Sequence, residues 1–107
     1  NPKIFLYSED IDICLRAKKK GLKTYFSPDT RVIHIGQQSS KGLPGNALVG
    51  EVKGLLFVSK ANFNPVKYLL IKLILTIGSL LRLIIFGIIL RSTQRKQIYK
   101  QVIKTIW

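Results

Sequence analysis

Hydrophobic positions near the start of the chain recur with the period of an amphipathic helix. Ser8 stands at a typical N-cap position, and Gly21 stands where a left-handed residue would end a helix. Cys14 lies beside the hydrophobic stripe and is expected to pack in the core. The pattern predicts a helix over about residues 9–20, and one of its faces can be buried through Ile11, Leu15, Lys18 and Leu22.

The next residues change to a pattern that is typical of short strands. Residues 23–26 are rich in aromatic and β-branched side chains, and residues 30–35 alternate between apolar and polar types. Pro28 and Asp29 between them predict a turn. Residues 36–46 are rich in glycine, serine and amide side chains and predict a loop.

The rest of the chain predicts helices. A helix is expected over residues 47–63, and Asn64-Pro65 should end it. Residues 69–90 form an apolar run that would be roughly 33 Å long as a helix, which is close to the thickness of a bilayer core. Residues 91–107 are basic and amphipathic, with hydrophobic residues four positions apart at Ile98, Val102 and Ile106.

The apolar run is compatible with three placements: a helix that spans a membrane, a helix that lies in the interface, and a helix buried against another part of the protein. Its polar residues form one narrow stripe that includes the cations Lys72 and Arg82. Two cations near the middle of a span would cost several kcal/mol. The interface is therefore favoured over a span. Basic residues flank the run on both sides, so the positive-inside rule gives no orientation.

The charge of the chain indicates phosphate as a class of binding target. The 107 residues carry a net charge of +13, and residues 67–107 hold eight Lys/Arg and no Asp/Glu. Such a cationic tail seeks phosphate on lipid or on nucleic acid. Few aromatic residues lie among these cations, and the long apolar run favours lipid over nucleic acid. The single cysteine excludes an internal disulfide and a zinc site built from several cysteines.

Three of the five acidic residues, Glu9, Asp10 and Asp12, lie within four positions. Carboxylates in the first turn of a helix complement its dipole, and this is the role we expect for Asp12. Glu9 and Asp10 follow an aromatic run that leads into the helix start, where both can project into a cleft. One of the two could accept a proton from a hydroxyl group while the other positions the acceptor.

The ordered set of residues in FLYSEDIDICLRAKKKGLKTYFSPDTRVIHIGQQSS (5–40) resembles the end of the catalytic domain of family 2 glycosyltransferases. These are inverting enzymes of the GT-A fold, and the rhamnosyltransferase-like members are most similar. The matching positions cover about the first 40 residues: Phe5, Tyr7, Glu9, Asp10, Asp12, Cys14, Arg16, Gly21, Tyr25, Pro28, Val32, His34, Gly36, Ser39 and Ser40.

The resemblance implies an α/β fold and a role for each matching site residue. Asp10 would be the general base, and Glu9 would help bind the acceptor. His34 would ligate a divalent metal, Mn²⁺ or Mg²⁺, beside the donor diphosphate. The diphosphate or acceptor loop would consist of Gly36, Gln37, Gln38, Ser39 and Ser40. From the residues alone, His34 in an alternating strand is more typical of a structural role, and the loop is equally consistent with a plain solvated segment.

The resemblance also implies what residues 1–107 lack. In the family, the nucleotide-binding half of the catalytic domain comes before the part that residues 5–40 resemble. The Asp-x-Asp metal motif of that half does not occur in this chain, because Asp10-Ile11-Asp12 is part of the acidic cluster at the helix start. The chain opens on Asn1-Pro2 and contains no methionine, so we expect it to be part of a longer protein.

These observations predict three regions. Residues 1–45 would be the acceptor side of a GT-A domain, 46–65 a connecting helix, and 66–107 a basic, membrane-associated helical tail. The predicted function is transfer of a hexose or rhamnose from a nucleotide-sugar donor to a glycan or lipid-linked acceptor, at the cytoplasmic face of the cell membrane. The alternatives are a cationic membrane-binding module without catalysis and a helical segment that packs on a partner.

Overall fold

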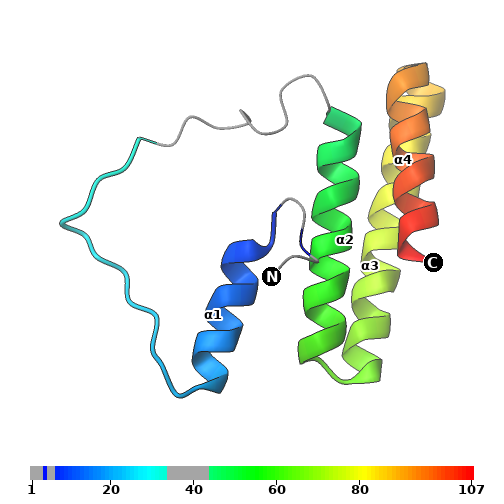
Figure 1. Ribbon diagram of the computed structural model, residues 1–107. Helices are drawn as coiled ribbons and strands as arrows, with labels where there is room; N and C mark the ends of the chain where they lie inside the picture. Colours follow the sequence, from blue (N-terminus) through cyan, green and yellow to red (C-terminus); the bar gives the residue numbers. More distant parts are fainter. Residues whose placement is uncertain (1–3, 5–6, 34–43) are drawn as a thin grey trace.

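Helices dominate the structure, a computed structural model that describes residue 4, residues 7–33 and residues 44–107. The helices lie side by side, and a long segment connects α1 to α2 (Figure 1). In chain order they are α1 (Glu9–Lys19), α2 (Pro44–Asn62), α3 (Pro65–Ile84), the π-helix η2 (Ile85–Ile89) and α4 (Thr93–Ile106).

The predicted α/β fold is wrong, because no residue of the described part of the chain lies in a β-strand. Residues 23–26 and 30–33 were expected to be strand and are unpaired, and Tyr25 and Phe26 are 81% and 90% exposed. The segment extends away from the helices (Figure 1). A strand needs a neighbour for its backbone hydrogen bonds, and a two-stranded hairpin is marginal in water by itself. The β-strand propensity of these residues is therefore not sufficient to form a sheet.

The start and end of α1 confirm the predicted helix. The Asp12 amide donates to the Ser8 carbonyl at 3.0 Å, which closes the first turn. At the other end, the Leu22 amide donates to the Ala17 carbonyl and the Gly21 amide to the Lys18 carbonyl, both at 3.0 Å. These two bonds form a Schellman motif, which needs a left-handed residue. Gly21 supplies it with φ 77°.

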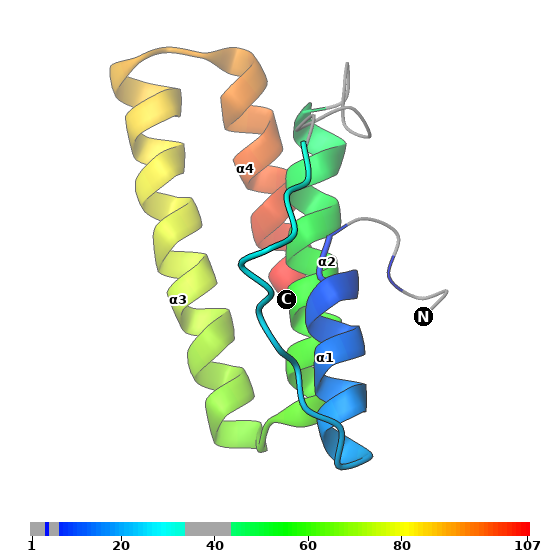
Figure 2. The same cartoon turned by 90° about the vertical axis from the view of Figure 1, so that its left-hand side faces the viewer.

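The hydrophobic core lies between α2 and α4. Val49, Val52 and Leu56 of α2 are buried together with two residues of α4, Val102 and Ile106. The four-residue spacing seen in the sequence of α4 is thus confirmed as its core-facing side. Among the described elements α1 contacts α2 alone. In Figure 1 α2 lies between α1 and α3, and Figure 2 shows α1 in front of α2 with α3 apart from both.

α3 presents two different faces. It begins after Asn64, whose side chain accepts a hydrogen bond from the Lys67 amide at 2.9 Å, with Pro65 in the first turn. The face toward the other helices carries partly or fully buried residues, among them Thr76 and Ser79 of the polar stripe. On the opposite side it exposes a hydrophobic stripe, which we call the outer face of α3: Leu70, Ile74, Ile77, Leu81 and Ile84, continued by Ile88 in η2.

Two contacts fix how α4 runs along α3. Phe86 and Tyr99 stack with their ring centroids 5.8 Å apart. The Trp107 indole nitrogen donates to the Thr76 hydroxyl at 3.1 Å. Since the residue numbers rise on α4 as they fall on α3, the two helices are antiparallel. Lys100 and Lys104 lie between Tyr99 and Trp107 in sequence and are therefore level with the stretch of α3 between Thr76 and Phe86.

Trp107 also contacts a partly buried cation of α3, Lys72. The Lys72 ammonium lies 4.0 Å from the centre of the Trp107 ring and 5.8 Å from that of Tyr68. A cation held over an indole ring gains electrostatic stabilisation. The sequence placed Lys72 on the polar stripe of the apolar run, and the structure shows that its ammonium group lies over Trp107 at the end of α4.

We expect Trp107→Ala to lower the free energy of unfolding by about 1–2 kcal/mol, because one hydrogen bond and one cation–π contact are lost. Trp107→Phe keeps a ring over Lys72 and loses only the hydrogen bond, so its effect should be smaller. Urea denaturation followed by circular dichroism measures both. Equal stability of the Ala variant and the wild type would contradict the role of this contact.

Candidate functional site

The predicted catalytic pair lies at the exposed start of α1. Glu9 and Asp10 are the first two residues of the helix, and both are exposed. The Ile11 amide donates to Asp10 Oδ1 at 2.8 Å. Because amides in the first turn have no partner within the helix, this bond satisfies one of them and orients the carboxylate. The second oxygen has no hydrogen bond of its own among the described residues, and because Asp10 is exposed this oxygen can accept a proton.

The backbone that leads into this pair is strained. Tyr7 and Ser8 both adopt left-handed conformations, with φ of 64° and 69°. Residues other than glycine rarely adopt this region and do so at a cost of about 1–3 kcal/mol each. Ser8 occupies the expected N-cap position, but its side chain makes no capping hydrogen bond and is buried. Contacts with the rest of the protein must therefore hold the helix start in place.

Gly54 of α2 supplies this contact. A Cβ atom on Gly54 would lie 2.8 Å from the Tyr7 carbonyl oxygen and 3.2 Å from both Cβ and Oγ of Ser8. Only glycine lets the two backbones approach this closely. The sequence suggested a helix here despite Gly54 and gave no sign of a partner for it. The site therefore includes a positioning residue that lies 44 positions beyond Asp10.

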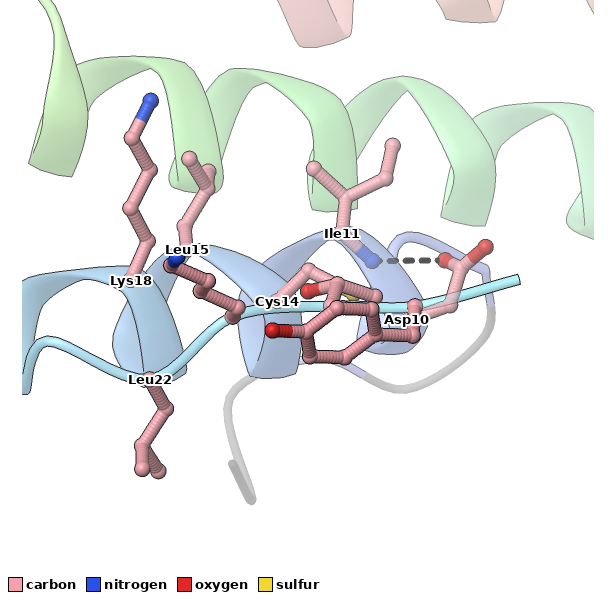
Figure 3. A pocket seen from close by; sticks show the side chains of 9 residues that line it. Asp10, Ile11, Cys14, Leu15, Lys18 and Leu22 are labelled. Carbon is pink, nitrogen blue, oxygen red and sulfur yellow. Dashed lines mark hydrogen bonds between the residues drawn. The ribbon is translucent and has the colours of Figure 1, made fainter. Parts of the chain in front are cut away.

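A pocket of about 630 Å³ opens beside Asp10. Its walls are one side of α1 and the chain that leaves it, and they are mostly apolar: Asp10, Ile11, Cys14, Leu15, Lys18, Leu22, Lys23, Thr24 and Tyr25. Asp10 and Lys18 lie at opposite ends of it, while Ile11 and Leu15 point toward α2 and Leu22 points away (Figure 3). The volume is within the range of small-molecule sites.

Two expectations for α1 need correction. Cys14 was expected to pack in the core and is exposed. The stripe that could be buried is also largely open, since Ile11 and Leu22 are exposed. The reason is that α2 is the one described element that α1 contacts, so no second described element covers this side. Among the described residues, the stripe lines the pocket instead.

Asp12 has the structural role that the sequence indicated. It is buried, and its carboxylate accepts a hydrogen bond from Arg16 Nε at 2.9 Å, four residues further along α1. The Arg16 side chain is exposed, so such a pair contributes about 0.3–0.5 kcal/mol. Asp12 thus has a different environment from the exposed Glu9 and Asp10, although it lies only two positions from Asp10.

The other predicted site residues lie outside the described part of the chain. These are the metal ligand His34 and the loop of Gly36, Gln37, Gln38, Ser39 and Ser40. Within residues 7–33 and 44–107, no three His, Cys, Asp or Glu side chains come close enough to hold a metal ion.

A second candidate site is the outer face of α3. The continuous helix Pro65–Ile89 is long and apolar enough to cross a membrane, and only 6% of its most apolar stretch is buried inside the protein. A core helix would be mostly covered. If α3 crossed a bilayer with α4 packed on it, Lys100 and Lys104 would enter the hydrocarbon. Each cation near the centre of a span costs about 2.5–3.5 kcal/mol on insertion scales.

Comparison of the chain with known protein families, with curated proteins and with solved structures finds no match.

Proposed function

We propose that this chain is the acceptor-side part of a membrane-associated inverting glycosyltransferase, acting at the cytoplasmic face of the cell membrane. The donor would be a nucleotide-linked sugar, a hexose or rhamnose, and the acceptor a glycan or a lipid-linked glycan. The observation that carries the proposal is Asp10, whose oriented carboxylate lies at an exposed helix start beside a pocket. The ordered motif in residues 5–40 supplies the reaction class.

The proposed chemistry uses two carboxylates. Asp10 removes the proton from an acceptor hydroxyl as its oxygen attacks the anomeric carbon. The bond from that carbon to the diphosphate breaks, the nucleoside diphosphate leaves with the bonding electrons, and the configuration inverts. Glu9 is exposed next to Asp10 and can hydrogen-bond the acceptor. The divalent metal implied for His34 stays a prediction, and no step of the proposal passes through it.

The resemblance covers only the acceptor side, so residues 1–107 by themselves are expected to transfer no sugar. The experiment compares this chain with the same chain joined to its natural upstream sequence, each supplied with radiolabelled nucleotide sugars and membranes. Incorporation of label by the longer protein alone is the expected result. Transfer by residues 1–107 alone would refute the proposal that the donor side of the site lies in the upstream sequence. If the longer protein transferred no sugar from any donor tested, the proposed class of enzyme would be refuted.

A second candidate is a membrane-binding module without catalysis. It is favoured by the way α2, α3 and α4 share contacts while α1 lies outside this group. In that case residues 44–107 would carry the whole function, and substitution of Asp10 would change no measurable property except the local structure of α1. The sugar-transfer assay separates the two candidates.

A further inference from the structure

The outer face of α3 is an exposed apolar surface that follows the helix axis. Its six members follow one another at spacings of four, three, four, three and four residues: Leu70, Ile74, Ile77, Leu81, Ile84 and Ile88. With 3.6 residues per turn, the first five lie on one narrow line along the helix. Ile74, Ile77 and Ile88 are each more than half exposed. The line runs the whole length of α3, so its occupant must be extended and apolar.

Cations lie along one flank of this face and beyond its far end, and one acid, Glu51 of α2, lines a pocket together with Ile74 and Arg82 on that flank. Lys67 and Arg82 lie on one flank of the line, and Arg91 follows its far end. All three are exposed, and residues 67–107 contain no Asp or Glu. An apolar stripe with basic residues at its borders matches a bilayer whose headgroups are anionic. A protein partner with an apolar groove would not need this one-sided charge.

The contacts of α4 decide the orientation. Thr76 and Lys72 of α3 meet Trp107, and Phe86 meets Tyr99, so α4 covers the inner side of α3 over this stretch. The exposed cations Lys100 and Lys104 lie on α4 within the same stretch. A helix that crossed the membrane would take them into the hydrocarbon. A helix parallel to the membrane plane keeps them in water or among headgroups and still buries the outer face.

We propose that α3 lies in the plane of an anionic membrane, with its outer face in the lipid and α4 and α2 on the water side. This inference rests on the membrane association in the proposed function but not on sugar transfer. The inference names the surface that meets the lipid, the class of lipid and the orientation of the helix. Length and composition do not decide the orientation, because this helix is also long and apolar enough to span a membrane.

The first test is vesicle binding by the full chain. Residues 1–107 should sediment with phosphatidylcholine vesicles that contain phosphatidylglycerol, and much less with pure phosphatidylcholine or at high salt. Ile77→Glu should lower the partition coefficient at least about tenfold, because an apolar side chain that would enter the lipid is replaced by a charged one. No binding to anionic vesicles at low salt would overturn the proposal.

Ile33→Glu is the matched control for that variant. It makes the same change at a residue that is 93% exposed and belongs to the segment between α1 and α2, not to α3. We expect nearly wild-type binding, and both positions are exposed, so both variants should fold. An equal loss in the two variants would show that added charge, and not the outer face, decides binding, and would overturn the assignment of this surface.

The second test measures depth. Cys14→Ser provides a background without cysteine, and nitroxide labels are then placed by Leu70→Cys, Ile77→Cys and Ile88→Cys. In-plane binding predicts similar, shallow depths at all three positions. A spanning helix predicts the greatest depth at position 77 and opposite leaflets for the ends, and that result would overturn the orientation. Sugar transfer is not measured in either test, so these failures are distinct from failure of the proposed chemistry.

Discussion

Replacing Asp10 by Asn in the protein with its natural upstream sequence is expected to reduce sugar transfer at least about hundredfold. A general base contributes about 10²–10⁴ to a rate, and the amide cannot accept the proton of the acceptor hydroxyl. The amide oxygen can still accept the hydrogen bond from the Ile11 amide, so the start of α1 should keep its geometry. Initial rates with a radiolabelled donor measure the effect, and donor binding measured separately should be nearly unchanged.

Asp12→Asn is the matched control for this prediction. It makes the same substitution two positions along the same helix, at a carboxylate that is paired with Arg16 and buried. We expect a small loss of stability and rates close to those of the wild type. Turnover by the Asp10 variant at the level of the Asp12 variant would refute the assignment of the base.

Replacing Gly54 by Ala is expected to displace the start of α1 from α2. The added Cβ would lie 2.8 Å from the Tyr7 carbonyl oxygen, closer than two such atoms approach, and that oxygen belongs to the backbone and cannot rotate away. Overpacking costs about 1–3 kcal/mol, which exceeds the gain of up to about 1 kcal/mol for alanine over glycine within a helix. Urea denaturation should show a lower free energy of unfolding, and transfer by the longer protein should fall because Glu9 and Asp10 move.

Gly87→Ala serves as the control for the backbone contact. A Cβ there would meet only the flexible side chain of Lys96, at 3.4 Å or more. This variant should be as stable as the wild type or slightly more stable. If Gly54→Ala behaved in the same way, the close approach of α1 to α2 would not hold the helix start.

The parts of the fold that depend on local sequence could be predicted. The bounds of α1 follow from its acidic start and from Gly21, and the core side of α4 follows from Val102 and Ile106. Capping and hydrophobic periodicity depend on residues that are close in sequence, so the sequence alone predicts these helix bounds and faces. The predicted strands failed because pairing is a property of two segments, and residues 23–26 contact no partner strand among the described residues.

The candidate site was predictable only in part. The residues Glu9 and Asp10 stand out by type and position, and the separate role of Asp12 follows from its place in the helix. Gly54 could not be assigned, because a glycine within a helix does not reveal which distant backbone approaches it. The exposure of Cys14 was missed for a related reason, since periodicity marks a possible face without showing whether another element covers it.

The single attachment of α1 has a thermodynamic consequence. Among the described elements α1 contacts only α2 and contributes no residue to the core between α2 and α4. The attachment of α1 to α2 and the packing of α2 with α3 and α4 therefore have separate free energies. The smaller one governs a local opening in which α1 leaves α2 while the other helices stay assembled. Strain at Tyr7 and Ser8 is released in this opening and favours it. The acidic pair therefore belongs to the least stable cooperative unit among the described helices, and the face proposed for lipid belongs to a more stable one.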